Sequence, residues 1–130
     1  MKRILFAFTL ILLTASVTSA QQKEASIAAV DSVVYDFGDI KEVDGPATHI
    51  FKITNKGEVA LVVTKVVASC GCTTPDWTKE PIPTGGIGEI KVTYDPTNRP
   101  GPFTKTISVY SNGKTGSFIL TIKGKVIPKG

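Results

Sequence analysis

Short apolar runs, broken by turn residues at nearly regular intervals, limit what this chain can fold into more than any other feature. Val, Ile, Thr, Phe and Tyr dominate the runs, and Gly, Pro, Asn or Asp interrupts them about every ten residues, without a sustained helical period. The predicted strands are Val30–Phe37, His49–Thr54, Ala60–Val67, Glu89–Tyr94, Thr104–Tyr110 and Phe118–Ile127. Six or seven strands in a chain of this length are typical of a β-sandwich.

Alternation and turn chemistry support this interpretation. Apolar and polar side chains alternate strictly in Glu89–Tyr94, so one face of that strand is expected to be buried and the other wet. Asn112-Gly113 is the strongest hairpin signal, because both residue types tolerate positive φ. We therefore expect a two-residue turn there.

Residues 1–20 have the three parts of a secretory signal. Met1-Lys2-Arg3 is basic, Ile4–Leu13 is apolar and Thr14–Ala20 is small and polar. The apolar run is much shorter than the ~20 residues of a membrane-spanning helix, so we expect cleavage between Ala20 and Gln21 and no stable membrane span afterwards. The expected organisation is a signal peptide at 1–20, a polar lead-in at 21–27 and one domain at 28–130. The mature protein is predicted to be exported and soluble, in the periplasm or outside the cell.

Charge gives no support for nucleic-acid binding. Lys2 and Arg3 leave with the leader, which lowers the formal net charge from +4 to +2. With 42% apolar and 20% charged residues, the chain has the composition of a globular domain that buries a core.

Cys70 and Cys72 are the only cysteines and flank Gly71 just after an apolar strand. In an extended strand their Cα atoms would lie about 7 Å apart, so a disulfide requires the chain to turn at Gly71. Such a small loop would add only about 1.6 kcal/mol of stability through chain entropy. Four uses therefore compete: a disulfide or thiol pair that shapes a tight corner, thiol–disulfide exchange, binding of a soft metal such as Cu(I), and a cross-link between chains. We favour the corner.

Other residues that could carry chemistry lack partners in the sequence. His49, the only histidine, enters a strand, and Trp77 is expected to cover an opening of the sandwich. Thr84–Gly88 has neither the lysine nor the helix of a phosphate-binding loop. We therefore predict no catalytic residue, no metal, no cofactor and no enzymatic activity.

A series of motifs, in order along the chain, resembles the bacterial domain of unknown function 1573. They are Tyr35–Ile40, Phe51–Gly57, Ser69–Thr74, Gly88–Asp95, Gly101–Lys105, Val109–Asn112 and Gly124–Val126. The resemblance implies an all-β fold, an immunoglobulin-like antiparallel β-sandwich of about seven strands, similar to major-sperm-protein and hydin-type domains. It also implies an exported protein of the kind common in the Bacteroidetes. The family has no established activity, so its Cys-Gly-Cys pattern indicates a position for a functional site but not the chemistry of that site.

The expected function is interaction rather than catalysis. We predict an exported module for protein interaction or envelope scaffolding, whose partner is another envelope protein bound at an open sheet edge. Val30–Phe37 and Phe118–Ile127 are the candidate edges. The alternative is thiol–disulfide exchange or Cu(I) binding at Cys70-Gly71-Cys72.

Overall fold

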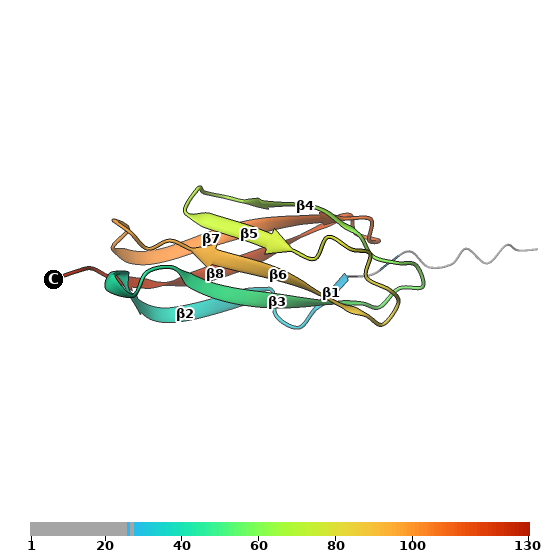
Figure 1. Ribbon diagram of the computed structural model, residues 1–130, viewed down its shortest axis with the longest axis horizontal. Helices are drawn as coiled ribbons and strands as arrows, with labels where there is room; N and C mark the ends of the chain where they lie inside the picture. The colour runs from blue at the N-terminus through green and yellow to red at the C-terminus, as the bar shows by residue number, and fades with distance from the viewer. Residues whose placement is uncertain (1–25, 27) are drawn as a thin grey trace, which may run out of the picture.

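Eight strands and one short 3-10 helix make up the described part of the chain (Figure 1). The computed structural model describes residue 26 and residues 28–130. The predicted leader, its cleavage between Ala20 and Gln21, and the lead-in except Ser26 lie outside the described residues. The elements are β1 Ala28–Val30, β2 Val34–Lys41, η1 Glu42–Asp44, β3 Ala47–Asn55, β4 Val63–Ala68, β5 Thr73–Trp77, β6 Ile87–Tyr94, β7 Gly101–Ser111 and β8 Ser117–Ile127.

The strands form two packed sheets, with the orders β1-β3-β6-β5 and β2-β8-β7-β4. The predicted all-β, immunoglobulin-like sandwich is confirmed. One pair departs from the expected antiparallel arrangement, because β2 runs parallel to β8. The chain leaves the first sheet after Val30 and enters the second at Val34 without reversing, so β2 keeps the direction of β1.

Two differences raise the strand number above about seven. The predicted strand Val30–Phe37 is divided between β1 and β2, which belong to different sheets. β5 lies outside the predicted strands, and Pro75 at its centre is unusual within a strand. The pairing pattern explains the exception. Thr78 donates to Glu89, so by alternation the N position of Pro75 faces away from β6, on the open side of an edge strand.

The hairpin between β7 and β8 is longer than predicted. Its loop is closed by the N–H of Ser111 donating to the carbonyl of Gly116 at 2.9 Å, and positive φ is found at Gly116 (74°). Asn112 instead accepts from the N–H of Val62 at 2.8 Å and donates to the carbonyl of Ala60 at 3.0 Å. Its side chain ties this loop to the chain entering β4, and the prediction of a two-residue turn is wrong.

The core lies between the inner faces of the two sheets. The predicted alternation in β6 is confirmed, because Ile90, Val92 and Tyr94 are at most 1% exposed. Ile107 of β7 and Ile122 of β8 oppose them from the second sheet, both with no exposed surface. Burying each such side chain stabilises the fold by about 1.5–3 kcal/mol. In Figure 1, η1 and the C-terminus lie at one end of the elongated sandwich, and the β3–β4 and β7–β8 loops at the other.

Candidate functional site

The cysteines lie in the turn that carries the chain from β4, at the edge of one sheet, to β5, at the edge of the other. Cys70 and Cys72 are joined by a disulfide, and their Cα atoms are 5.3 Å apart. Gly71 between them is exposed, and a Cβ added there would have no neighbour within 4 Å. The disulfide therefore spans a corner whose tip faces open space.

Backbone hydrogen bonds hold this corner independently of the sulfur atoms. The N–H of Thr73 donates to the carbonyl of Cys70 at 3.2 Å, and the N–H of Asp95 donates to the carbonyl of Cys72 at 2.8 Å. Before the turn, Ser69 donates its N–H to the carbonyl of Thr106 and accepts from the N–H of Thr106 at its side-chain oxygen. The path of the chain does not depend on the disulfide alone.

The two sulfur atoms occupy different environments. Cys72 is 3% exposed and belongs to the hydrophobic core, whereas Cys70 is only half-buried. The Cys70 Sγ accepts from the N–H of Cys72 at 3.1 Å. The Cys72 Sγ lies 3.6 Å from the hydroxyl of the buried Thr73. Each sulfur thus has one neighbouring hydrogen-bond donor.

Metal binding gains no support from this corner. Among the residues that the structure describes, no group of three or more His, Cys, Asp or Glu side chains is placed to hold a metal ion. Trp77 packs half-buried against the core, and the Nζ of Lys79 lies 3.0 Å from its ring centroid.

A second feature, which the sequence did not reveal, is an open stretch on the edge of β3. β1 pairs with β3 only at Ile53–Asn55, so within the described residues no strand flanks that side of Ala47–Lys52. The N–H and C=O of Asn55 bond to Gly86 and Gly85, on the β6 side. Since the β3–β6 register is unbroken, alternation directs the backbone groups of Thr48, Ile50 and Lys52 away from β6.

The other edge strands carry features that hinder pairing with a further strand. Gly38 of β2 has a φ of 67° in a bulge between Asp36 and Asp39, where the register with β8 shifts. β5 has Pro75 at its centre, and the register of β4 shifts between Val63 and Lys65. Bulges, charges and proline are the usual means of protecting a sheet edge. The open stretch of β3 has no bulge and no proline.

The edges predicted from the sequence are corrected in part. Phe118–Ile127 is not an edge, because β8 lies between β2 and β7. Val30–Phe37 does contribute edge residues, but to two different sheets. The open stretch arises because β1 stops at Val30. Asp31-Ser32 is the local signal for this break, since polar residues interrupt the apolar run there.

Among the described residues, His49 at this open edge has no charged partner for acid–base chemistry. Its ring stacks on Tyr35 of β2, with the ring centroids 3.5 Å apart. Burial lowers the pKa of His49 below its usual 6.5, so the imidazole is neutral at pH 7. A hollow of about 200 Å³, lined by residues 30–32 and 49–52, lies beside it.

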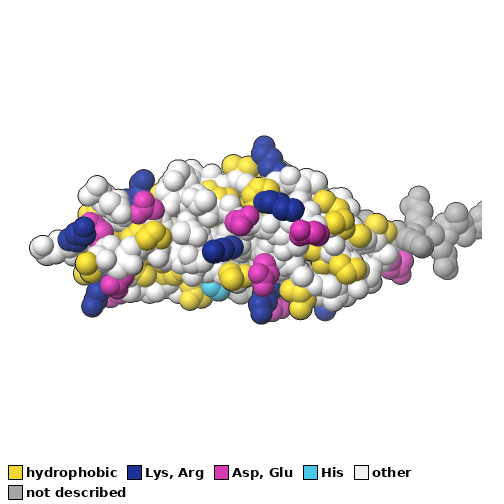
Figure 2. All heavy atoms as spheres, in the orientation of Figure 1, with side chains coloured by type: hydrophobic (Ala, Val, Ile, Leu, Met, Phe, Trp, Pro, Cys, Tyr) yellow, Lys and Arg dark blue, Asp and Glu magenta, His cyan; other side chains and the backbone are white. Residues whose placement is uncertain are grey.

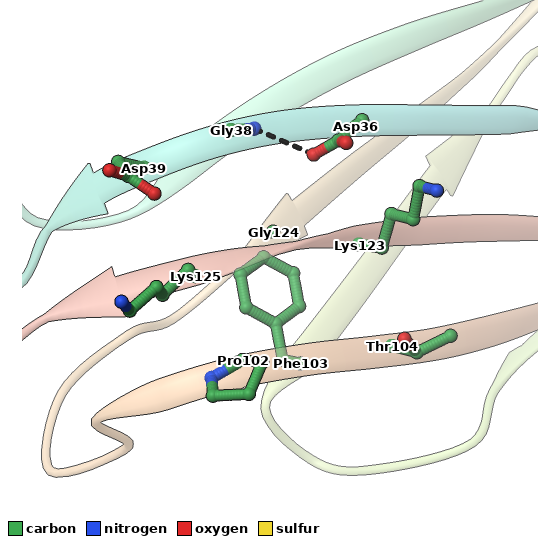
Figure 3. Close-up of a pocket in the computed structure, with 9 residues that line it drawn as sticks. All are labelled: Asp36, Gly38, Asp39, Pro102, Phe103, Thr104, Lys123, Gly124 and Lys125. Carbon is green, nitrogen blue, oxygen red and sulfur yellow. Dashed lines mark hydrogen bonds between the residues drawn. The ribbon is translucent and has the colours of Figure 1, made fainter.

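A hollow of about 320 Å³ lies on the outer face of β2, β7 and β8, and side chains of both charges line it (Figure 3). Figure 3 shows Phe103 directed toward Gly124, with Lys123 and Lys125 on β8 and Asp36 on β2. Carboxylates and ammonium groups both line it, so it selects neither cations nor anions. Figure 2 likewise shows acidic and basic side chains interspersed over one face of the molecule.

Comparison with known proteins gives this architecture a family. The sequence profile described as "Protein of unknown function (DUF1573)" matches residues 28–126. The chain belongs to this family. The DUF1573 resemblance of the sequence motifs is therefore confirmed. No curated protein matches the chain. The described residues of this DUF1573 domain contain no helix long and apolar enough to cross a membrane.

Solved structures similar to this DUF1573 domain show the same fold. A protein of unknown function from Porphyromonas gingivalis W83 has a TM-score of 0.70 at 17% identity, over 85% of this chain and 51% of that one. The Vibrio cholerae VesB protease has a TM-score of 0.59 at 19% identity, over 76% and 31%. WR4, a C. elegans MSP family member, has a TM-score of 0.50 at 13% identity, over 78% and 99%. The chain thus spans about half of the Porphyromonas protein and about a third of VesB.

Proposed function

We propose that this DUF1573 domain is an exported, non-catalytic interaction module that binds an extended segment of another envelope protein along β3. The open edge at Thr48, Ile50 and Lys52 carries the proposal. A segment that pairs there would extend the first sheet by one strand, a common mode of peptide recognition.

Backbone pairing supplies the affinity in this proposal. The three residues offer three N–H donors and three C=O acceptors on the open side, and each hydrogen bond contributes about 0.5–1.5 kcal/mol net. The exposed Ile50 would flank outward side chains of the segment. Inward side chains would lie beside His49 and Phe51, so apolar residues are expected at alternate positions.

A segment of a different protein fits this edge better than a second copy. If two copies paired antiparallel about Ile50, Thr48 of each would lie opposite Lys52 of the other. β1 of each copy, which covers Ile53–Asn55, would then meet the chain before Thr48 of its partner. A free segment brings no second β1, so within the described residues it has to clear the β1 of one copy, which ends at Val30.

Two variants at one position test the binding mode. Ile50→Pro removes an N–H that is not part of the β3–β6 ladder, whereas Ile50→Thr keeps that N–H and the β-branched shape. Peptides selected from a random library on the wild-type domain should bind Ile50→Thr within about threefold and lose at least about tenfold with Ile50→Pro. Circular dichroism and thermal unfolding check that both variants are folded.

Several results would overturn the proposal. Equal binding of the peptides to Ile50→Pro and to wild type would show that they bind away from the β3 edge. A library that gives no binders would contradict the proposal that the domain binds an extended peptide. Self-association that Ile50→Pro abolishes would make a second copy the occupant. Export is tested separately by N-terminal sequencing of the protein from the cell envelope, with Gln21 as the expected first residue. A chain that retains Met1, or stays in the cytosol, would contradict it.

A further inference from the structure

We infer that the Cys70–Cys72 disulfide is a thiol–disulfide exchange site, attacked at Cys70, with Cys72 as the leaving sulfur. The unequal burial of the two cysteines carries this assignment. Cys70 is half-buried beside the exposed Gly71, whereas Cys72 is 3% exposed. An incoming thiolate must contact the sulfur that it attacks, so access favours Cys70.

The reduced state has a hydrogen-bond donor for each sulfur. The Thr73 hydroxyl, 3.6 Å from the Cys72 Sγ, can donate to the departing thiolate. The N–H of Cys72, 3.1 Å from the Cys70 Sγ, can donate to the second thiolate when it is released. Donors that stabilise a thiolate make it a better leaving group. Thr73 is therefore a positioning residue for this exchange.

The corner can be reduced without unfolding the sandwich. The bonds from Thr73 to the Cys70 carbonyl and from Asp95 to the Cys72 carbonyl involve only backbone atoms. A loop this small also contributes little chain entropy to stability. Exchange therefore changes the sulfur chemistry while the path from β4 to β5 is kept.

The co-reactant is a dithiol. One of its thiolates forms a bond to the Cys70 Sγ, the Cys70–Cys72 bond breaks, and Cys72 leaves as a thiolate that takes a proton from water. The second thiol of the reductant then attacks its own sulfur in the mixed disulfide and releases Cys70. The protein disulfide gains two electrons and two protons, and the dithiol becomes a disulfide.

Glutathione, a monothiol, traps the first step. The oxidised full chain is incubated with reduced glutathione, quenched with acid and mapped by mass spectrometry, with the adduct expected on Cys70. With glutathione disulfide as the reagent, Cys72→Ser should react at Cys70 at least about tenfold faster than Cys70→Ser reacts at Cys72. An adduct mainly on Cys72, or equal rates, would overturn the assignment.

Thr73→Val keeps the shape of the side chain but removes the donor. Dithiothreitol should reduce this variant about three- to tenfold more slowly than the wild type. As a control, the Thr73→Val/Cys72→Ser variant should react with glutathione disulfide at Cys70 at the same rate as Cys72→Ser alone. An unchanged reduction rate would show that Thr73 has no role in the exchange.

The fluorescence of Trp77, the only tryptophan, reports whether the domain stays folded, and its spectrum should remain native during reduction. Reduction that occurs only together with unfolding would overturn the exchange site.

Discussion

Tyr35 of β2 and His49 of β3 stack face to face across the gap between the two sheets, with their ring planes 8° from parallel. Phe37 packs edge-on against Tyr35, and Phe51 packs edge-on against His49. These rings lie on the side of the sandwich where β1 has left β3 uncovered. Aromatic contacts thus join two strands that share no backbone ladder.

The burial of His49 makes stability depend on pH. Burial lowers the pKa of His49 in the folded state, so below about pH 6.5 the unfolded chain binds more protons at this residue than the folded chain does. The free energy of unfolding should therefore decrease as the pH falls through 6.5 toward the lowered pKa. Urea unfolding between pH ~7.5 and ~5.5 measures this change, and His49→Gln should reduce it. A His49→Gln variant with the same pH dependence as wild type would contradict the assignment to His49.

Gly124→Ala should destabilise the fold by about 1–3 kcal/mol. A Cβ at this position would lie 2.9 Å from the backbone oxygen of Gly38 and 2.9 Å from the ring of Phe103. Gly71→Ala is the matched control, because its Cβ would have no neighbour within 4 Å, and it should stay within about 0.5 kcal/mol of wild type. Denaturant unfolding of both variants decides the point, and equal stabilities would show that the packing over Gly124 is not tight.

Asn55→Ala should cost about 2–4 kcal/mol in thermal or denaturant unfolding. The side chain is fully buried, donates to the carbonyls of Val59 and Ile82, and accepts from the N–H of Gly57. Asn112→Ala also removes side-chain bonds, but at an exposed position where water replaces them, so its cost should be about 1 kcal/mol or less. A larger loss for Asn112→Ala than for Asn55→Ala would contradict this order.

Replacing both cysteines by serine should lower the free energy of unfolding by no more than about 1–2 kcal/mol. The backbone bonds from Thr73 and Asp95 remain to hold the corner. Val92→Ala, in a central strand at a site with no exposed surface, should cost about 1–3 kcal/mol. Both variants are measured by denaturant unfolding in oxidising buffer. A double serine variant that fails to fold while Val92→Ala stays native would show that the cysteines are structural.

Features that depend on neighbouring residues could be predicted from the amino-acid sequence alone. The alternation of Ile90, Val92 and Tyr94 with polar residues predicted a strand with one buried face, because side-chain direction in a strand depends only on position. The ordered motifs also predicted the family and its sandwich fold. Cys70 and Cys72 could be selected as candidates because two cysteines around one glycine are visible without coordinates.

Which strands pair and which sheet edges stay open depends on contacts between distant parts of the chain. β2 and β8 pair Val34 with Thr121, residues far apart in the chain, and no local signal specifies that partner. Pro75 lies in a strand because β5 is an edge, and that position follows from the sheet order. The open stretch at Ile50 and the deeper burial of Cys72 than of Cys70 also follow from contacts between distant parts of the chain. Exposure at each site depends on long-range packing, and packing brings together residues whose spacing in the sequence carries no periodic signal.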